Sequence, residues 1–380
     1  MRALFAFLGW SLATFGMACS FCQNPINRAT FGEEMDTAAV VVIGTLANPR
    51  LNPNPIAGAG AGTTDFTIER VLKNDGSLKS LGTMALSRYM PVPDPKNPPR
   101  FLIFFEKFRD RLEPLQGFAV KSASLPGYLE AAGEARKKGR VPALVFYASH
   151  LDHADEAIAL DAFMEFAKSK DADVAKAAMA LDPTLIRRLL AKNDLDADRT
   201  SLFAFLLGCC GQDRDGDALL KLADSLTGER KSAVDGVLAG YVTLRPQEGW
   251  RKITDILADT KQPFATRFAA LRTIRMLQGW KGAEIKAETL SAYKHIVRDG
   301  EMADLAVEDL RRWQWWELTA EVAAQFGQPT HRAPIVQHCL IRYALSCPLP
   351  AAQDLVARAR KVDPAYVEDQ EKILAELSGR

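Results

Sequence analysis

Residues 37–46 have the sequence Thr-Ala-Ala-Val-Val-Val-Ile-Gly-Thr-Leu, a continuous apolar run that is rich in β-branched side chains. Such a run is typical of a strand that is buried on both faces or that lies in the middle of a small barrel. Residues 64–72 (TDFTIERVL) alternate instead, and this alternation predicts that Phe66, Ile68 and Val71 face inward. Three further short runs, at 84–89, 101–105 and 118–120, are separated by turn-rich segments. Five strands joined in this way predict a small closed barrel or sandwich over residues 19–124.

From residue 125 the pattern changes to alanine- and leucine-rich segments with apolar side chains at helical spacing. Many of these segments begin with Asp, Ser, Thr or Pro, which are the residues favoured at helix N-termini. The loops between them are short, so consecutive helices should be antiparallel neighbours. Paired helices give units of about 35 to 45 residues, the period of HEAT or armadillo repeats. The sequence therefore predicts an α+β multidomain fold, with the barrel followed by an all-α, HEAT-like solenoid over residues 125–380.

The N-terminus has the pattern of a secretory signal peptide over residues 1–18. After Met1-Arg2, residues 3–17 are uncharged, and Gly16-Met17-Ala18 places small residues at the cleavage positions. The apolar run is shorter than the ~20 residues that a spanning helix needs. We therefore expect an exported protein, periplasmic, secreted or at the cell surface, with no transmembrane span in the mature chain. A lipoprotein signal, in which Cys19 carries a lipid anchor, is the alternative.

The composition is that of an ordinary soluble globular chain. Of its 380 residues, 48% are hydrophobic and 25% are charged, and the formal net charge is +1. A chain with this balance has no global positive field to attract a phosphate backbone or an anionic membrane. Nucleic acid is therefore not an expected partner, and a length of 380 residues favours two domains or a repeat array.

Four segments carry a family resemblance: residues 19–22 (CSFC), 38–46 (AAVVVIGTL), 63–73 (TTDFTIERVLK) and 201–211 (SLFAFLLGCCG). Together they resemble secreted, uncharacterised proteins of the planctomycete type that carry helical repeats behind a β-domain, which implies an organisation but no activity. The first hundred residues also resemble the netrin-like or tissue-inhibitor OB barrel. That resemblance implies protease inhibition by the free amine of Cys19. However, such domains pair their N-terminal cysteines with cysteines deeper in the barrel, and this chain has none between Cys22 and Cys209.

Cys19 and Cys22 have the C-x-x-C spacing of redox and metal motifs. In an exported chain a local disulfide between them is the simpler interpretation. A redox role is the alternative. The remaining cysteines, at positions 209, 210, 339 and 347, are expected to be buried thiols that pack as small hydrophobic side chains.

Residues 150–155 (HLDHAD) are the densest cluster of metal-capable groups. A divalent ion could bind His150, His153 and a carboxylate such as Asp155. The segment is also a helix-to-helix turn, in which Asp152 or Asp155 would cap the next helix. We favour the turn and predict no metal and no cofactor.

Asp161 and Glu165 are four residues apart on one predicted helix. Paired carboxylates can perform acid–base catalysis. A solvated helix face with a surface ion pair explains the same spacing, and we favour that interpretation.

Residues 311–316 (RRWQWW) contain three of the six tryptophans in the chain. Trp and Arg dominate interface hot spots, so Arg312, Trp313, Trp315 and Trp316 are candidates for partner binding. Indole rings also fill the spaces between packed helices, and we favour that role for part of the cluster. Trp316 is the best candidate for exposure.

The sequence contains no arrangement of residues that identifies an enzyme. It therefore predicts a non-enzymatic interaction or scaffold protein that binds a protein partner in the cell envelope, through its solenoid or its β-domain. A metal-dependent hydrolase that uses the His150 region is the alternative from another class. A redox or protease-inhibitor-like role for the N-terminal Cys19–Cys22 pair is a third.

The signal pattern gives the first testable prediction. Protein expressed in a native-like host and recovered from outside the cytoplasm should have the intact mass of a chain that begins at Cys19. A mature cellular form that retains Met1 would contradict export.

Overall fold

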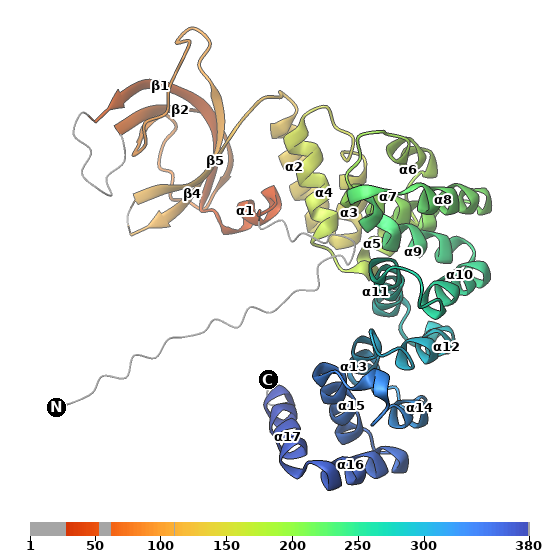
Figure 1. The fold of residues 1–380 in the computed structure, drawn as a ribbon. Helices are drawn as coiled ribbons and strands as arrows, with labels where there is room; N and C mark the ends of the chain where they lie inside the picture. The colour runs from red at the N-terminus through yellow and green to blue at the C-terminus, as the bar shows by residue number, and fades with distance from the viewer. Residues whose placement is uncertain (1–27, 53–61, 110, 379–380) are drawn as a thin grey trace, which may run out of the picture. The chain divides into compact units, whose positions relative to one another are not determined.

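The computed structural model describes residues 28–52, 62–109 and 111–378, and it has an α+β architecture (Figure 1). A five-stranded antiparallel sheet comes first and is followed by a long series of helices. The chain divides into two compact units, which meet in sequence between Leu181 and Asp182. The first unit contains the sheet and the helices to α5, and the second contains α6 to α17.

The sheet confirms four of the five predicted strands in position, while the fifth, predicted at 118–120, is a longer strand that starts at Arg111 and overlaps the prediction only at its end. The sheet consists of β1 (Val40–Leu51), β2 (Gly62–Asn74), β3 (Thr83–Leu86), β4 (Arg100–Phe108) and β5 (Arg111–Ala119), in the spatial order β3-β2-β1-β4-β5. One face carries a hydrophobic core made of Val40, Val42, Leu46, Phe66, Leu86, Ile103 and Phe105. Ile68 and Val71 pack against this core, as the alternation predicted. Among the described residues no strand pairing joins β3 to β5, so the two outer strands each have one edge without a strand partner.

A seven-residue helix, α1 (Phe31–Thr37), precedes the sheet and was not predicted. It begins with a capping box, in which the Thr30 hydroxyl accepts the Glu33 N–H and the Glu33 carboxylate accepts the Thr30 N–H. The Phe31 ring lies edge-on to the Phe118 ring of β5, with 5.1 Å between the centroids. α1 is thereby anchored on the face of the sheet opposite the core cluster.

The rest of the first unit is helical and consists of α2 (Leu125–Lys137), α3 (Arg140–Ala148), α4 (Glu156–Ala167) and α5 (Asp171–Ala178). The change from strand to helix occurs between the end of β5 and the start of α2, where the sequence changes its periodicity.

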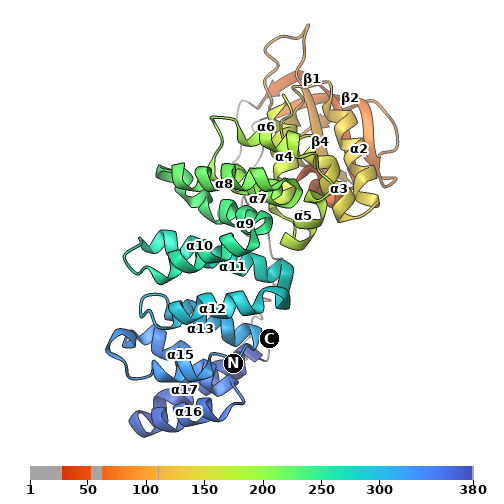
Figure 2. The same ribbon diagram turned by 90° about the vertical axis from the view of Figure 1, so that its right-hand side faces the viewer.

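The second unit consists of helices that stack layer upon layer (Figure 2). They are α6 (Pro183–Leu190), α7 (Ala197–Cys210), α8 (Asp213–Ser225), α9 (Val234–Leu244), α10 (Pro246–Ala258), α11 (Phe264–Lys281), α12 (Lys286–Val297), α13 (Ala303–Trp313), α14 (Thr319–Ala324), α15 (Pro334–Ser346), α16 (Pro350–Val362) and α17 (Pro364–Ser378), with short 3-10 turns at Gly228–Ala233, Gly282–Ile285 and Pro329–His331. None of the helices in the described ranges combines the length and the apolar character that crossing a bilayer requires.

Buried aspartates join helices that belong to neighbouring layers of the second unit. Asp215 accepts two hydrogen bonds from Arg187, which lies 28 residues earlier in the chain. Asp309 accepts from Arg275 across 34 residues and also from the Tyr293 hydroxyl. Each of these carboxylates is nearly inaccessible to solvent, so its arginine partner is needed to offset the loss of hydration.

Helices α7 and α9 approach each other so closely that glycine is required at their crossing. A Cβ atom on Gly240 would lie 2.3 Å from the Ala204 carbonyl oxygen, and one on Gly208 would lie 2.3 Å from the Gly240 Cα. Neither clash can be relieved by rotation of a side chain, because both involve backbone atoms.

This crossing gives a stability prediction. Gly240→Ala should lower the free energy of unfolding of the second unit by about 1–3 kcal/mol, because the added methyl group forces the two helices apart. Gly279→Ala in α11 is the matched control, since a Cβ there meets nothing within 4 Å. It should raise stability by roughly 0.5–1 kcal/mol through the better helix propensity of alanine. Urea unfolding followed by tryptophan fluorescence would measure both, and equal stability of the two variants would contradict the close contact.

Candidate binding cleft and the placement of the predicted residues

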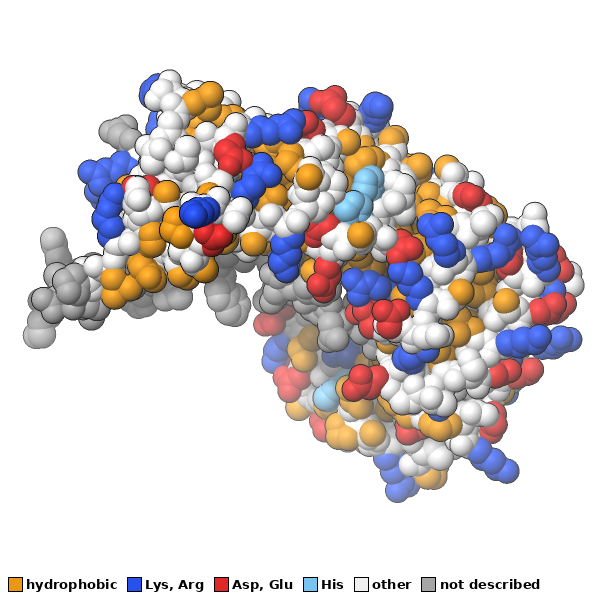
Figure 3. All heavy atoms as spheres, turned by 90° about the horizontal axis from the view of Figure 1, so that it is seen from above, with side chains coloured by type: hydrophobic (Ala, Val, Ile, Leu, Met, Phe, Trp, Pro, Cys, Tyr) orange, Lys and Arg blue, Asp and Glu red, His pale blue; other side chains and the backbone are white. Residues whose placement is uncertain are grey.

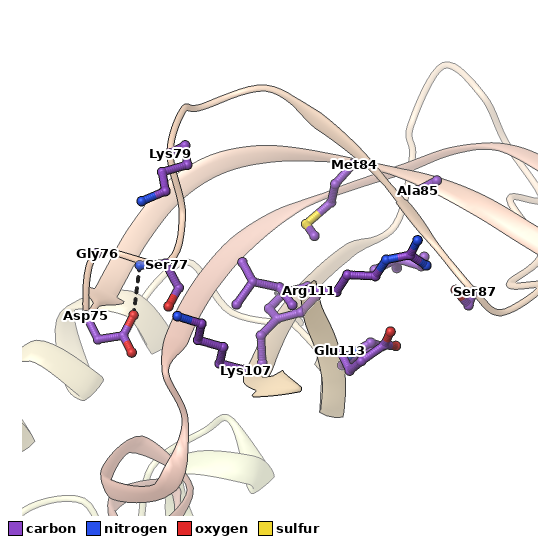
Figure 4. A pocket seen from close by; sticks show the side chains of 14 residues that line it. Asp75, Gly76, Ser77, Lys79, Met84, Ala85, Ser87, Lys107, Arg111 and Glu113 are labelled. Carbon is purple, nitrogen blue, oxygen red and sulfur yellow. Dashed lines mark hydrogen bonds between the residues drawn. The ribbon is translucent and has the colours of Figure 1, made fainter. Parts of the chain in front are cut away.

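A cleft of about 790 Å³ lies in the β-domain, between the outer strands β3 and β5 (Figure 4). Its lining comes from the β2–β3 loop, from β3 and the residue that follows it, from the end of β4 and from the start of β5. The lining residues are Asp75, Gly76, Ser77, Lys79, Met84, Ala85, Leu86, Ser87, Phe105, Lys107, Arg111, Leu112, Glu113 and Pro114.

The floor of the cleft is apolar. Leu86 and Phe105 belong to the core cluster of the sheet, and Met84 and Leu112 pack against that cluster while remaining partly accessible. The cleft is therefore an opening into the hydrophobic core that the sheet leaves uncovered where its two edges are not joined.

Three cationic side chains, from three different elements, lie around this floor. They are Lys79 from the β2–β3 loop, Lys107 from β4 and Arg111 from β5, and all three are exposed. No carboxylate of the described residues lies within ion-pair distance of any of them.

Two carboxylates, Asp75 and Glu113, share the cleft with these cations. Asp75 is already engaged, because its carboxylate accepts the Ser77 N–H at 2.9 Å (Figure 4). The hydrogen bonds from Ser77, with a smaller contribution from Lys107, hold the pKa of Asp75 below its usual value. Cationic groups therefore outnumber carboxylates in the cleft, and this excess is local. Over the helical part of the face in Figure 3, acidic and basic side chains are interspersed.

Sequence reasoning missed the cleft. The cations are separated in the chain, and nothing in the sequence shows that β3 and β5 leave a gap. Residues 106–113 (EKFRDRLE) carry three basic and three acidic side chains, so the sequence there gives no signal of a cationic site.

Asp155 caps α4, as the turn interpretation of residues 150–155 predicts. Its carboxylate accepts the Ala157 N–H at 3.0 Å. His150 donates from Nδ1 to the Phe146 carbonyl oxygen, and its ring packs on the Tyr128 ring. The rings of His150 and His153 are stacked with 6.1 Å between their centroids. Over the described ranges, no group of three or more His, Cys, Asp or Glu side chains converges as a metal site requires.

The structure brings one further pair together, Ser124 and His153, which sequence reasoning did not single out. The Ser124 hydroxyl lies 3.3 Å from Nε2 of His153, while Nδ1 of His153 accepts the Asp155 N–H. Because Nδ1 is the acceptor, the ring proton of neutral His153 is on Nε2 and points to the serine. In this tautomer the imidazole cannot take a proton from Ser124, so the pair does not form an activated nucleophile.

Asp161 and Glu165 are not on a solvated face, and that prediction is wrong. Only 6% of Asp161 and 2% of Glu165 is accessible. Asp161 accepts hydrogen bonds of 2.6 Å from the Phe31 N–H of α1 and from the Tyr128 hydroxyl of α2. Glu165 forms an ion pair of 2.5 Å with Arg140 of α3. The helix face is buried because α1, whose existence was missed, packs on it.

Two outer ion pairs surround this buried pair of carboxylates. Arg136 of α2 contacts Asp36, and Lys168 contacts Glu33. Each joins α1 to the helices that follow the sheet. Together these hydrogen bonds and ion pairs hold α1, α2, α3 and α4 to one another. The partners of the two carboxylates are the Phe31 N–H, the Tyr128 hydroxyl and Arg140, so the pair has a structural role.

The tryptophan cluster lies between packed helices. Trp315 is buried, with Lys286 above its ring, while Trp313 and Trp316 are half-buried. Trp313 packs on Tyr293, and Trp316 packs edge-on to Tyr343 at 5.1 Å. Arg312 is exposed and forms an ion pair with Glu308 of its own helix. None of the three indoles is fully exposed, so Trp316 is less accessible than predicted.

The cysteines follow the prediction in part. Cys339 and Cys347 are buried free thiols, whereas Cys209 and Cys210 are half-buried. The predicted disulfide between Cys19 and Cys22, and the signal peptide before it, lie outside the described residues.

Comparison with known proteins assigns no family. No protein-family model and no curated protein matches the chain. Among solved structures, human deoxyhypusine hydroxylase in complex with glycerol is similar at a TM-score of 0.27 and 15% identity, over 67% of this chain and 91% of that chain. A likeness of this strength does not establish a shared fold.

The burial of Asp161 gives a pH prediction. Burial, opposed by the hydrogen bonds from Tyr128 and Phe31, raises the pKa of Asp161 from 3.8 to about 6. The carboxyl group thus binds its proton more tightly in the folded chain than in the unfolded chain. Its contribution to stability is therefore fully present below pH 3.8, is lost as the pH rises through about 6, and is constant above that.

Asp161→Asn removes this titration. The stability of wild type minus that of Asp161→Asn should therefore fall by about 2 kcal/mol between pH 4 and pH 6.5. Native-state hydrogen exchange of the α4 amides would measure it within the first unit. A difference that stays flat or rises over this range would contradict the assignment.

Proposed function

We propose that the chain is an exported, non-enzymatic interaction protein whose β-domain binds a protein partner in the cleft between β3 and β5. The observation that carries this proposal is the cleft itself, where three cations without a described ion-pair partner surround an apolar floor. Such a combination of a few charged groups and an apolar surface is typical of a recognition site.

The hydrophobic core of the sheet is partly uncovered at the cleft, and this supports binding of a partner there. Apolar side chains such as Met84 and Leu112 are only partly covered, and covering them with a partner would remove further apolar surface from water. The cations add specificity, because only a partner with negative charge can neutralise them.

The finer architecture belongs to the same proposal. We take the sheet to be an incompletely closed, OB-like barrel and the helical region to be a HEAT-like solenoid. Buried ion pairs between helices of successive pairs, such as Arg187–Asp215 and Arg275–Asp309, support repeated stacking of helix pairs, although their separations of 28 and 34 residues are shorter than the HEAT period of about 40 residues. A solenoid offers a long second surface, on which Arg312 and the half-buried Trp313 and Trp316 remain candidates for contact.

Export rests on the signal pattern of residues 1–18 and on the resemblance to secreted planctomycete-type proteins. In that setting the partner is a protein of the cell envelope, and Cys19 and Cys22 form a local disulfide. The exported compartment favours that pairing.

Affinity capture from the native envelope with the mature chain tests the proposal. A partner identified by mass spectrometry should bind the purified chain, and Lys107→Glu/Arg111→Glu should weaken that binding at least tenfold. The absence of any partner that binds the purified chain would contradict the proposal. Metal analysis of the same preparation tests the alternative of a metal-dependent hydrolase, since stoichiometric zinc or manganese would contradict a non-enzymatic interaction protein.

A further inference from the structure

We infer that the cleft binds an extended acidic segment of the partner, which adds to the free edge of β5 as a further strand. This inference rests on the proposed function, because it names the kind of ligand that the same cleft takes.

The cleft lies at the strand edge and not on one face of the sheet. Successive side chains of a strand point to opposite faces, so a hollow on one face touches every second residue. Here four consecutive positions of β5, from Arg111 to Pro114, line the cleft, and so do Met84 to Ser87. Consecutive runs of this kind are expected where a hollow reaches the edges of both strands.

The edge of β5 is the longer of the two available edges. β5 pairs with β4 from Arg111 to Ala119, and in an antiparallel strand alternate N–H and C=O groups point away from that partner. β3 offers only four residues. Pro114 lacks an N–H and removes one donor at most, as is common in edge strands. A peptide of seven or eight residues can therefore pair along β5, the mode of recognition known as strand addition.

The charges select an acidic segment. Lys79, Lys107 and Arg111 face the cleft without a described ion-pair partner, and one of the two carboxylates, Asp75, is occupied by Ser77. A basic segment would meet three like charges and, besides Asp75, only the carboxylate of Glu113. Because the cations are exposed, each pair is weak and screened by salt, so we expect moderate affinity that falls as ionic strength rises.

The apolar floor selects the spacing. In an added strand the side chains alternate, so acidic residues directed at Arg111, which lies on the face of β5 opposite the core, place the intervening residues toward Leu112 on the core face. Lys107 pairs with Leu112 in register and lies on that same core face, at the rim of the floor. A segment in which acidic and β-branched residues alternate meets both requirements. A small dianion would occupy little of a cleft of about 790 Å³ and would leave this floor uncovered.

The probe is a fluorescent acetyl-(Glu-Val)4 peptide added to the mature full-length chain. We expect binding to wild type that weakens at least tenfold in Lys107→Glu/Arg111→Glu and in Lys79→Glu. Lys138→Glu/Lys170→Glu, which makes the same charge change on exposed lysines outside the cleft, should stay within twofold of wild type. Circular dichroism and thermal unfolding would confirm that each variant is folded. If Lys107→Glu/Arg111→Glu does not fold, Lys79→Glu, whose substitution lies in the β2–β3 loop, provides the test of the cleft alone.

Two further arms test strand addition itself. Amides of residues 111–119 should exchange more slowly in the presence of the peptide, and a peptide N-methylated at alternate residues should bind at least tenfold more weakly. Acetyl-(Lys-Val)4 should not bind, and inorganic phosphate at equal concentration should not displace the acidic peptide.

The outcomes separate this inference from the proposed function. If the acidic peptide does not bind, binds equally to the cleft and control variants, is displaced by phosphate, or tolerates N-methylation, the inference is wrong. If an envelope partner nevertheless binds the wild-type chain, the proposed function stands without it. If the peptide binds as expected but no envelope partner does, the chemistry of the cleft stands and the proposed function fails.

Discussion

The first unit depends on one buried carboxylate. Asp161 of α4 accepts the first N–H of α1 and the hydroxyl of Tyr128, and so joins a segment that precedes the sheet to helices that follow it. An ionised carboxylate in this position loses its hydration, and its two hydrogen bonds offset that loss only while α1 stays in place. On its other side α1 is fixed to the sheet by Phe31. The short helix therefore links the sheet, through Phe118 of β5, to α2 and α4.

The second unit uses the same chemistry at several positions. Asp215, Asp235 and Asp309 are buried, and each is paired with an arginine from another helix. Replacing such a pair with apolar side chains is often neutral or even stabilising, so its main effect is to define which helices pack together and in what register. Close contacts between backbones, as at Gly208 and Gly240, add a second constraint on the same helices. Polar pairing and small residues together explain how a long series of similar helices keeps a single order.

The elements were predictable because their signals are local. The β-branched run before Leu46 and the alternation around Phe66 are properties of neighbouring residues, and both strands formed where expected. For α1 the sequence carries one local signal, the capping-box spacing of Thr30 and Glu33. The helix was missed because seven residues are too few to show helical periodicity. The burial of Asp161 was not predictable, because it depends on Phe31, which is 130 residues away in the chain. The cleft was hidden for the same reason, since whether β3 meets β5 is decided by the curvature of the whole sheet.

An open strand edge beside an apolar floor is a hazard as well as a site. Such an edge can pair with the same edge of another copy, and proteins prevent this with charged side chains, proline or short strands. The edge described here has all three features, with Arg111 and Pro114 in β5, Lys107 beside it and only four residues in β3. Two copies brought edge to edge would bring these cations close together, and this repulsion disfavours self-association at low ionic strength. The same cations do not oppose an acidic strand from a different protein. The charges that protect the edge from its own copies would therefore also determine which partner can use it.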